Sequence, residues 1–244
     1  MQVHVRSWRL ELALAAALSL SLACSEATSI GSAEHGRDLF TSRQLSPSRL
    51  NNYSCASCHL AAFAETSLIH TGAPLAGVTR RPWFWGGQEN DLLRSINACR
   101  SYFMAAPEPL VPADANAQAL YAFLVSLEPG DPEPVPFEVV RAIEPLPRGD
   151  AAAGLLLFIN ACSYCHGAMH SGGGRLSERV PILPEDTLAE HAGYSLRAQR
   201  LVFVEKIRHG LFLGYGGDMP PFSKERLSDP QVSDLLEALG VLGE

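Results

Sequence analysis

The sequence predicts a mainly helical protein made of two tandem domains, because three features occur twice and in the same order. The motif C-x-x-C-H stands at residues 55–59 and again at residues 162–166. Each copy follows a glycine and a phenylalanine four positions apart, a spacing that puts both side chains on one face of a helix. These pairs are Gly36 and Phe40 in the first half and Gly154 and Phe158 in the second. Each half then ends in a run with apolar residues at helical spacing, which predicts a closing helix.

The repeat places two domains around a linker. We expect the first domain at residues 32–127 and the second at residues 150–244, with residues 128–149 between them. The linker contains six prolines. Proline at this density blocks helix and favours extended chain. We therefore predict a semi-rigid spacer, with a segment that wraps one domain as the alternative.

The helices that open and close each domain follow from the same patterns. A helix over residues 32–41 carries the first glycine–phenylalanine pair, and a helix over residues 116–127 closes the first domain. In the second domain a helix over residues 232–242 has the closing role, and Asp229 followed by Pro230 is a plausible start signal for it.

The motif C-x-x-C-H is the attachment site for c-type haem. Its cysteines form thioethers with the haem vinyl groups, and the histidine can ligate the iron. Alternative interpretations are a redox-active C-x-x-C or half of a zinc site, but a histidine at the end of both copies favours haem. We predict two covalent haems, attached through Cys55, Cys58, Cys162 and Cys165 and ligated on one face by His59 and His166.

Composition excludes one class of partner. The chain has 244 residues, 47% of them hydrophobic, and a formal net charge of −7. Nucleic-acid binding needs a basic surface, so no nucleic-acid partner is expected. Haem propionates would make the protein more acidic still, which favours a basic or neutral redox partner.

The N-terminus predicts export. Residues 1–23 combine positive charge with an apolar run too short to span a bilayer, as in a signal peptide. The sequence L-S-L-A-C at residues 20–24 resembles a bacterial lipobox. The resemblance implies that Cys24 is lipidated and that residues 24–31 tether the protein at the periplasmic side of a membrane. The residue after the cysteine is Ser25, and a serine at this position resembles the pattern of lipoproteins that are sent to the outer membrane. Ordinary cleavage nearby, with Cys24 incidental, is the alternative.

Two features of the chain resemble class I cytochromes c. The sequence G-G-D-M-P-P-F at residues 216–222 closely resembles the ligand loop of that family. The glycine–aromatic pairs resemble those that pack the family's first helix on its last. The resemblance implies that each half is a class I cytochrome c-like domain around one covalent haem, with Met219 as the second axial ligand of the second haem. The family often has an aromatic residue in the last helix. Phe123 matches it but Ala238 does not, which predicts looser helix pairing in the second half.

The first half carries a second resemblance. The segments concerned are Cys58-His59-Leu60, Gly72-Ala73-Pro74, Trp83-Phe84-Trp85-Gly86 and Ser95-Ile96-Asn97-Ala98-Cys99-Arg100. Together they resemble the N-terminal haem domain of thiosulfate dehydrogenases and related sulfur-oxidation cytochromes, over about residues 32–127. In that family a cysteine at the position of Cys99 ligates the haem and carries the sulfur chemistry. We expect the aromatic residues 83–85 to pack on a haem edge.

Met104 competes with Cys99 for the first haem. It lies ten residues before Asp114, just as Met219 lies ten residues before Asp229. This internal match favours Met104 as the ligand, with Cys99 as the alternative ligand or a buried thiol. His70 is a third candidate.

These observations predict an electron carrier rather than a catalyst. We expect a dihaem c-type cytochrome lipoprotein that transfers electrons between redox protein partners and is held to the membrane by lipid on Cys24. One alternative is a haem enzyme that oxidises a small sulfur compound such as thiosulfate at the first haem, with Cys99 as ligand. Another is a cytochrome subunit of a periplasmic dehydrogenase.

Overall fold

The computed structural model describes residues 32–61, 67–127, 131–138, 140–212 and 219–242. The protein is mainly helical, as predicted, and no sheet forms within these residues. Extended pairing in this part is limited to an isolated antiparallel bridge between Phe84 and Glu89. The predicted signal peptide and the tether with Cys24 lie outside the described residues.

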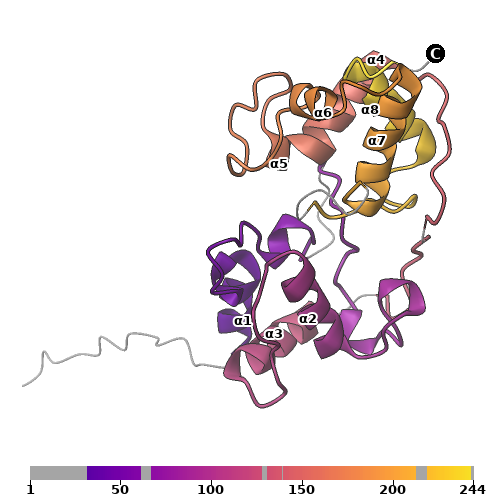
Figure 1. Ribbon diagram of the computed structural model, residues 1–244. Coiled ribbons are helices and arrows are strands. Elements are labelled where there is room, and N and C mark those ends of the chain that lie inside the picture. The colour runs from indigo at the N-terminus through magenta and orange to yellow at the C-terminus, as the bar shows by residue number, and fades with distance from the viewer. Residues whose placement is uncertain (1–31, 62–66, 128–130, 139, 213–218, 243–244) are drawn as a thin grey trace, which may run out of the picture.

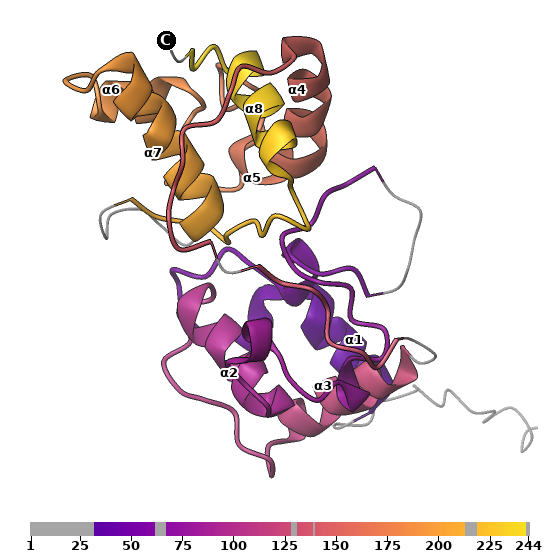
Figure 2. The ribbon, with the colours of Figure 1, turned by 90° about the vertical axis from the view of Figure 1, so that its right-hand side faces the viewer.

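The helices form two groups, which Figures 1 and 2 show as separate bodies joined by extended chain. The first group comprises α1 (Ala33–Thr41), η1 (Arg43–Leu45), η2 (Cys55–Ser57), η3 (Val78–Arg80), η4 (Trp85–Gly87), α2 (Leu92–Tyr102) and α3 (Ala115–Ser126). The second comprises α4 (Ala151–Leu157), the π-helical turn η5 (Phe158–Cys162), α5 (Ser163–His166), α6 (Glu185–Glu190), α7 (Leu196–His209) and α8 (Asp229–Ala238). We call residues 32–127 the first half and residues 150–242 the second half.

Glycine sets the packing of α1 on α3 in the first half. A Cβ atom at Gly36 would overlap the carbonyl oxygen of Ala119, so only glycine allows the two helices to approach this closely. One turn later Phe40 packs on Phe123, with ring centroids 5.2 Å apart. The predicted contact between the opening and closing helices is confirmed here.

The second half repeats this contact between α4 and α8. A Cβ atom at Gly154 would overlap the carbonyl oxygen of Asp234 and crowd the side chain of Ala238. The prediction of looser pairing in this half was therefore wrong. A small alanine at position 238 leaves room for α4, so the helices approach without an aromatic contact.

The predicted closing helix of the second half needs correction at both ends. Ser228 caps α8, which begins at Asp229 with Pro230 in its first turn, where the missing N–H of proline is not needed. The helix ends at Ala238 rather than at residue 242. Gly240 adopts a φ of +66°, a left-handed conformation that favours glycine and turns the chain away.

Each half has its own hydrophobic cluster. The first is centred on α1 and α3 and includes the buried residues Phe40, Leu120 and Phe123. The second is centred on η5, α7 and α8 and includes the buried residues Phe158, Phe203 and Leu236. Two separate cores explain why the two bodies in Figure 1 are joined by little more than loops and linker.

The proline-rich linker follows both halves rather than simply separating them. The carbonyl oxygen of Val140 accepts a hydrogen bond from His209 at the end of α7, and that of Pro147 accepts one of 2.8 Å from Arg200. Figure 2 shows the chain running along the side of the second body before it enters α4. Prolines leave many carbonyls without a helical partner, and side chains of α7 satisfy two of them.

Among the residues that the structure describes, four hydrogen bonds join the two halves directly. Three of them are Ile69 N–H to the carbonyl of Asn160 at 2.8 Å, Arg179 to the carbonyl of Leu50 at 2.9 Å and Arg226 to the carbonyl of His70 at 2.8 Å. The fourth joins the hydroxyl groups of Ser57 and Tyr164 at 3.5 Å. Most of these residues lie close in sequence to a C-x-x-C-H motif.

None of the helices in the described part of the chain is long and apolar enough to cross a membrane.

Candidate functional site

The first motif lies at one end of a large cavity. Cys55 begins η2, and the N–H of His59 donates back to the Cys55 carbonyl at 2.9 Å, which winds the motif into a single turn. Both cysteines and His59 line a cavity of about 450 Å³. This volume falls in the range of cofactor pockets, about 300–1,000 Å³.

The walls of this cavity are mainly apolar and aromatic. The aromatic part includes Trp83, Phe84, Trp85 and Phe103, and the rings of Trp85 and Phe103 stack with centroids 6.4 Å apart. Residues 83–85 thus line the cavity of the first motif, with half of the surface of Trp83 exposed, and their packing on a haem edge stays a prediction. Such a lining suits a large flat apolar body.

A backbone carbonyl orients His59. Its Nδ1 lies 2.8 Å from the carbonyl oxygen of Ala73, and because a carbonyl only accepts, Nδ1 must carry the proton. Gly72 lets this turn lie directly behind the imidazole ring, where a Cβ atom would overlap it. Burial lowers the pKa of His59, which keeps the ring neutral and leaves the Nε2 lone pair for a metal.

The second motif has the same arrangement. His166 is buried at the end of α5, and its Nδ1–H donates to the carbonyl oxygen of Pro181 at 2.9 Å. Burial lowers its pKa as well. Both predicted iron ligands are thus neutral imidazoles with a fixed tautomer and a free Nε2.

The thiols of both motifs are strongly shifted away from thiolate. Burial raises the pKa of Cys55 and of Cys162 to about 12 and that of Cys165 to about 11, and it also raises the pKa of Cys58. A redox-active C-x-x-C needs a lowered thiol pKa, so this environment argues against that interpretation. Among the described residues, no three His, Cys, Asp or Glu side chains come together as a metal site. This gives no support to zinc.

Cys99 and Met104, the two candidates for the second axial ligand at the first site, both line this cavity. Cys99 stands on α2, and Met104 follows that helix with only 4% of its surface exposed. Burial raises the pKa of the Cys99 thiol to about 12 in the absence of a metal. Both sulfur atoms are thus placed as candidate ligands. His70 does not line the cavity, and its carbonyl is engaged by Arg226.

Met219 lies against the hydrophobic cluster of the second half. It packs on the same cluster as Cys162 and is partly buried. Gly210 ends α7 with a φ of +78°, and a Cβ atom there would overlap the Met219 carbonyl, so glycine lets the returning loop pass the helix end. Residues 213–218, which hold the glycines of the predicted ligand loop, lie outside the described residues.

A buried arginine holds the chain that follows Met219. Arg208 donates to the carbonyls of Phe222 at 3.1 Å and Leu227 at 2.6 Å, and it pairs with Asp229 at 2.6 Å. Both ring nitrogens of the neighbouring His209 already have partners, Val140 and Glu205. His209 is therefore not a competing ligand.

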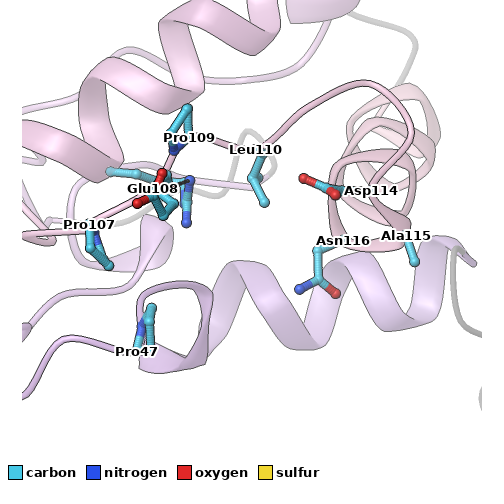
Figure 3. Close-up of a pocket in the computed structure, with 9 residues that line it drawn as sticks. Pro47, Pro107, Glu108, Pro109, Leu110, Asp114, Ala115 and Asn116 are labelled. Carbon is cyan, nitrogen blue, oxygen red and sulfur yellow. Dashed lines mark hydrogen bonds between the residues drawn. The ribbon is translucent and has the colours of Figure 1, made fainter.

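A second hollow of about 410 Å³ opens on the other side of Arg100. Figure 3 shows its wall coming from the loop Pro107–Leu110, the start of α3 and Pro47. It includes neither a cysteine nor a histidine, so the C-x-x-C-H chemistry belongs to the larger cavity.

The second half matches a known family. Residues 149–237 match the family model described as cytochrome C oxidase, cbb3-type, subunit III. This match supports a c-type cytochrome. A domain of this kind implies a covalently bound c-type haem and suggests electron transfer, and the matched residues include the whole second motif, His166 and Met219. No curated protein matches the chain.

The donors of the second motif fit the implied haem. Two cysteines three positions apart are followed by a neutral histidine whose Nε2 is free, and a thioether lies against the same cluster. The first motif offers the same donors and a cavity besides. When bound, a haem supplies one-electron redox chemistry, and the protein supplies axial ligands, dry packing and partner docking.

Two walls of the first cavity could not be predicted from the sequence. One is the linker segment Pro134–Phe137, and the other comes from the second half through Pro220, Pro221, Ser223 and Arg226. Both are contacts between distant parts of the chain, and no local pattern marks them.

Proposed function

We propose that the protein is a dihaem c-type cytochrome that transfers electrons between redox partners, with one class I-like domain around each haem. Cys55 and Cys58 would hold the first haem and Cys162 and Cys165 the second. The axial pairs would be His59 with Met104 and His166 with Met219.

The observation that carries this proposal is the placement of the two motifs against each other. The hydroxyl of Ser57, inside the first motif, lies 3.5 Å from that of Tyr164, inside the second. Cys165 also packs against the hydrophobic cluster of the first half. Electron transfer slows steeply as the distance between cofactors grows, so adjacent attachment sites favour passage from one haem to the other.

The experiment that tests the dihaem assignment is the intact mass of the exported protein, together with a haem stain under denaturing conditions. We expect the mass of two haems to be retained. A gain of one haem, or of none, would contradict the proposal.

We further propose that the protein is exported, lipidated at Cys24 and held at the periplasmic side of a bacterial membrane, the outer membrane in particular. The support is the lipobox-like sequence before Cys24. Cys24→Ala should move the protein from the membrane fraction to the soluble fraction. Unchanged fractionation would mean that a partner, rather than lipid, attaches it.

One observation favours a second function, oxidation of a small sulfur compound at the first haem. Cys99 lines the cavity that His59 and the first cysteine pair enter. Against it stands Met104, which lines the same cavity and is the preferred ligand. Reduction of the haems by thiosulfate, lost in Cys99→Ser, would make this function the preferred one. Co-purification with a dehydrogenase would instead indicate a docked subunit.

A further inference from the structure

Arg226 places an unpaired positive charge of the second half in the cavity of the first. It is half-buried, and its Nε donates to the carbonyl of His70 in the other half at 2.8 Å. Its two terminal nitrogens make no hydrogen bond or ion pair with any described residue. Both Arg226 and Ser223, which is 4% exposed, line the cavity that holds the first motif.

The acidic residues near Arg226 are occupied elsewhere. Lys224 pairs with Asp229 at 3.1 Å and with Glu138 at 3.5 Å. The carboxylate of Glu225 accepts a hydrogen bond from the backbone N–H of Glu138 at 3.1 Å. Each of these three carboxylates thus has a partner other than Arg226.

The other two guanidinium groups of the cavity are held by the backbone. Arg100 is 5% exposed and donates to the carbonyls of Leu45 and Glu108. Arg81 donates to the carbonyl of Ala76 at 2.8 Å. Arg226 thus differs from both in that its two terminal nitrogens have no partner among the described residues.

A half-buried cation without a counter-charge is costly, and an anion in the cavity would remove that cost. Burial lowers the pKa of Arg226, as expected where water is partly excluded. The predicted iron ligand His59 lines the same cavity as Arg226. Haem carries two carboxylates on its edge, and guanidinium binds a carboxylate through paired hydrogen bonds.

We propose that Arg226 is the counter-cation of a haem carboxylate in the first cavity, so that the second half completes the first haem site. This inference rests on the proposed function, because it needs a haem at Cys55 and Cys58. It makes the redox potential of the first haem depend on a residue of the other half, and therefore on the contact between the halves.

The test is a potentiometric titration of the intact holoprotein over a range of pH. Arg226→Gln removes the charge, and Arg226→Lys retains it. A positive charge near the iron favours the reduced state, so Arg226→Gln should lower the potential of the first haem. The unneutralised carboxylate should then take up a proton when the iron is reduced, so that this potential falls as pH rises through neutrality. Arg226→Lys should keep the potential close to that of the unmodified protein and largely independent of pH.

Arg179 provides a matched control. It also joins the halves through one hydrogen bond to a backbone carbonyl, that of Leu50, but it does not line the cavity. Arg179→Gln should therefore leave both potentials unchanged. The variant Cys55→Ala assigns the two measured potentials to the two haems. Its first haem keeps one unreacted vinyl group, which stays conjugated with the ring and moves the absorption of that haem to longer wavelength.

The outcomes separate the two proposals. Absence of haem from the first motif of the unmodified protein contradicts the proposed function. With that haem present, three results overturn the role of Arg226: no change in Arg226→Gln, an equal change in Arg179→Gln, or a change confined to the second haem. If Arg226→Gln loses the first haem, restoration by Arg226→Lys supports the role and failure to restore it overturns it.

Discussion

The two halves orient their predicted iron ligands in the same way but enclose their sites differently. His59 and His166 each donate Nδ1–H to a carbonyl some fifteen residues later in the chain, Ala73 or Pro181. The second half carries Met219 on its own cluster. The cavity of the first half is walled in addition by the linker and by residues 220–226 of the second half. Ligand orientation is thus local to each half, whereas enclosure of the first site depends on the whole chain.

The largest expected effect comes from removing one cysteine pair. Because each half has its own hydrophobic cluster, replacing Cys55 and Cys58 with alanine should remove one haem mass and leave the second haem attached. The reciprocal change at Cys162 and Cys165 should leave the first. Intact mass measures both, and loss of both haems from either variant would show that the halves do not mature independently.

Loss of an axial thioether should come next in size. Met219→Ala should convert the second haem from low spin to an open or water-bound state and lower its potential, because a soft neutral ligand is lost. The near-infrared band of a methionine–iron bond reports on this. Persistence of the band of the second haem would show that another residue is the ligand.

The first half offers the matching experiment with two candidate residues. If Met104 is the ligand, Met104→Ala should open the first site, while Cys99→Ser should leave its spectrum and potential nearly unchanged. Paramagnetic resonance of the ferric protein distinguishes a thiolate from a thioether ligand. A thiolate signal that disappears in Cys99→Ser would reverse the assignment.

The glycine contacts predict equal losses of stability in the two halves. Gly36→Ala and Gly154→Ala each force a Cβ atom onto a backbone carbonyl, at an expected cost of about 1–3 kcal/mol. Gly193→Ala is the control, since a Cβ atom there meets open space and should change stability by less than about 0.5 kcal/mol. Denaturant unfolding measures all three, and a much smaller loss at Gly154 would restore the idea of looser packing in the second half.

The smallest expected effect is on the loss of folding stability at acidic pH. Burial by itself would raise the pKa of Asp229, but hydrogen bonds from Lys224 and Arg208 outweigh it and lower that pKa. A carboxyl group whose pKa is lower in the folded state stabilises the protein at any pH above its pKa in the unfolded state, about 4. This stabilisation is lost as the pH falls through the pKa of the folded state. Asp229→Asn should cost about 1 kcal/mol at neutral pH. It should also weaken the loss of stability below pH 4, as measured by unfolding at several pH values.

Asp114 is the matched residue of the first half for this comparison. It stands before α3 as Asp229 opens α8, but its carboxylate accepts from the backbone N–H of Val111 rather than from a guanidinium. Asp114→Asn should therefore cost less stability at neutral pH than Asp229→Asn. An equal change would show that the ion pair with Arg208 is not the cause.

Local patterns allowed much of this architecture to be predicted. Gly36 and Phe40 identified both the opening helix and its contact with α3, because close helix packing requires a small residue at a fixed spacing. The position of Asp229 and Pro230 identified the start of α8, since both favour the first turn of a helix. The end of α8 was not predicted, because the apolar spacing continues past Ala238 to Leu239 and Leu242. The chain turns away there through the backbone conformation of Gly240, which the apolar pattern does not reveal.

Long-range contacts could not be predicted in this way. Nothing in the neighbourhood of Arg226 distinguishes it from any surface arginine, and its position in the first cavity depends on how the two halves meet. The linker is a similar case, because its prolines indicate extended chain but not which surfaces that chain follows. The identity of the first haem's second ligand also stays a prediction, since Cys99 and Met104 line one wall together.

The path of the linker has a consequence for biogenesis. The wall formed by residues 134–137 and 220–226 comes from parts of the chain that are synthesised after the first motif. On the proposed function, haem must be joined to Cys55 and Cys58 while the cavity is still open on that side. The C-terminal segment would then close over a haem already in place, which makes attachment an early step and the meeting of the halves a late one in the maturation of this protein.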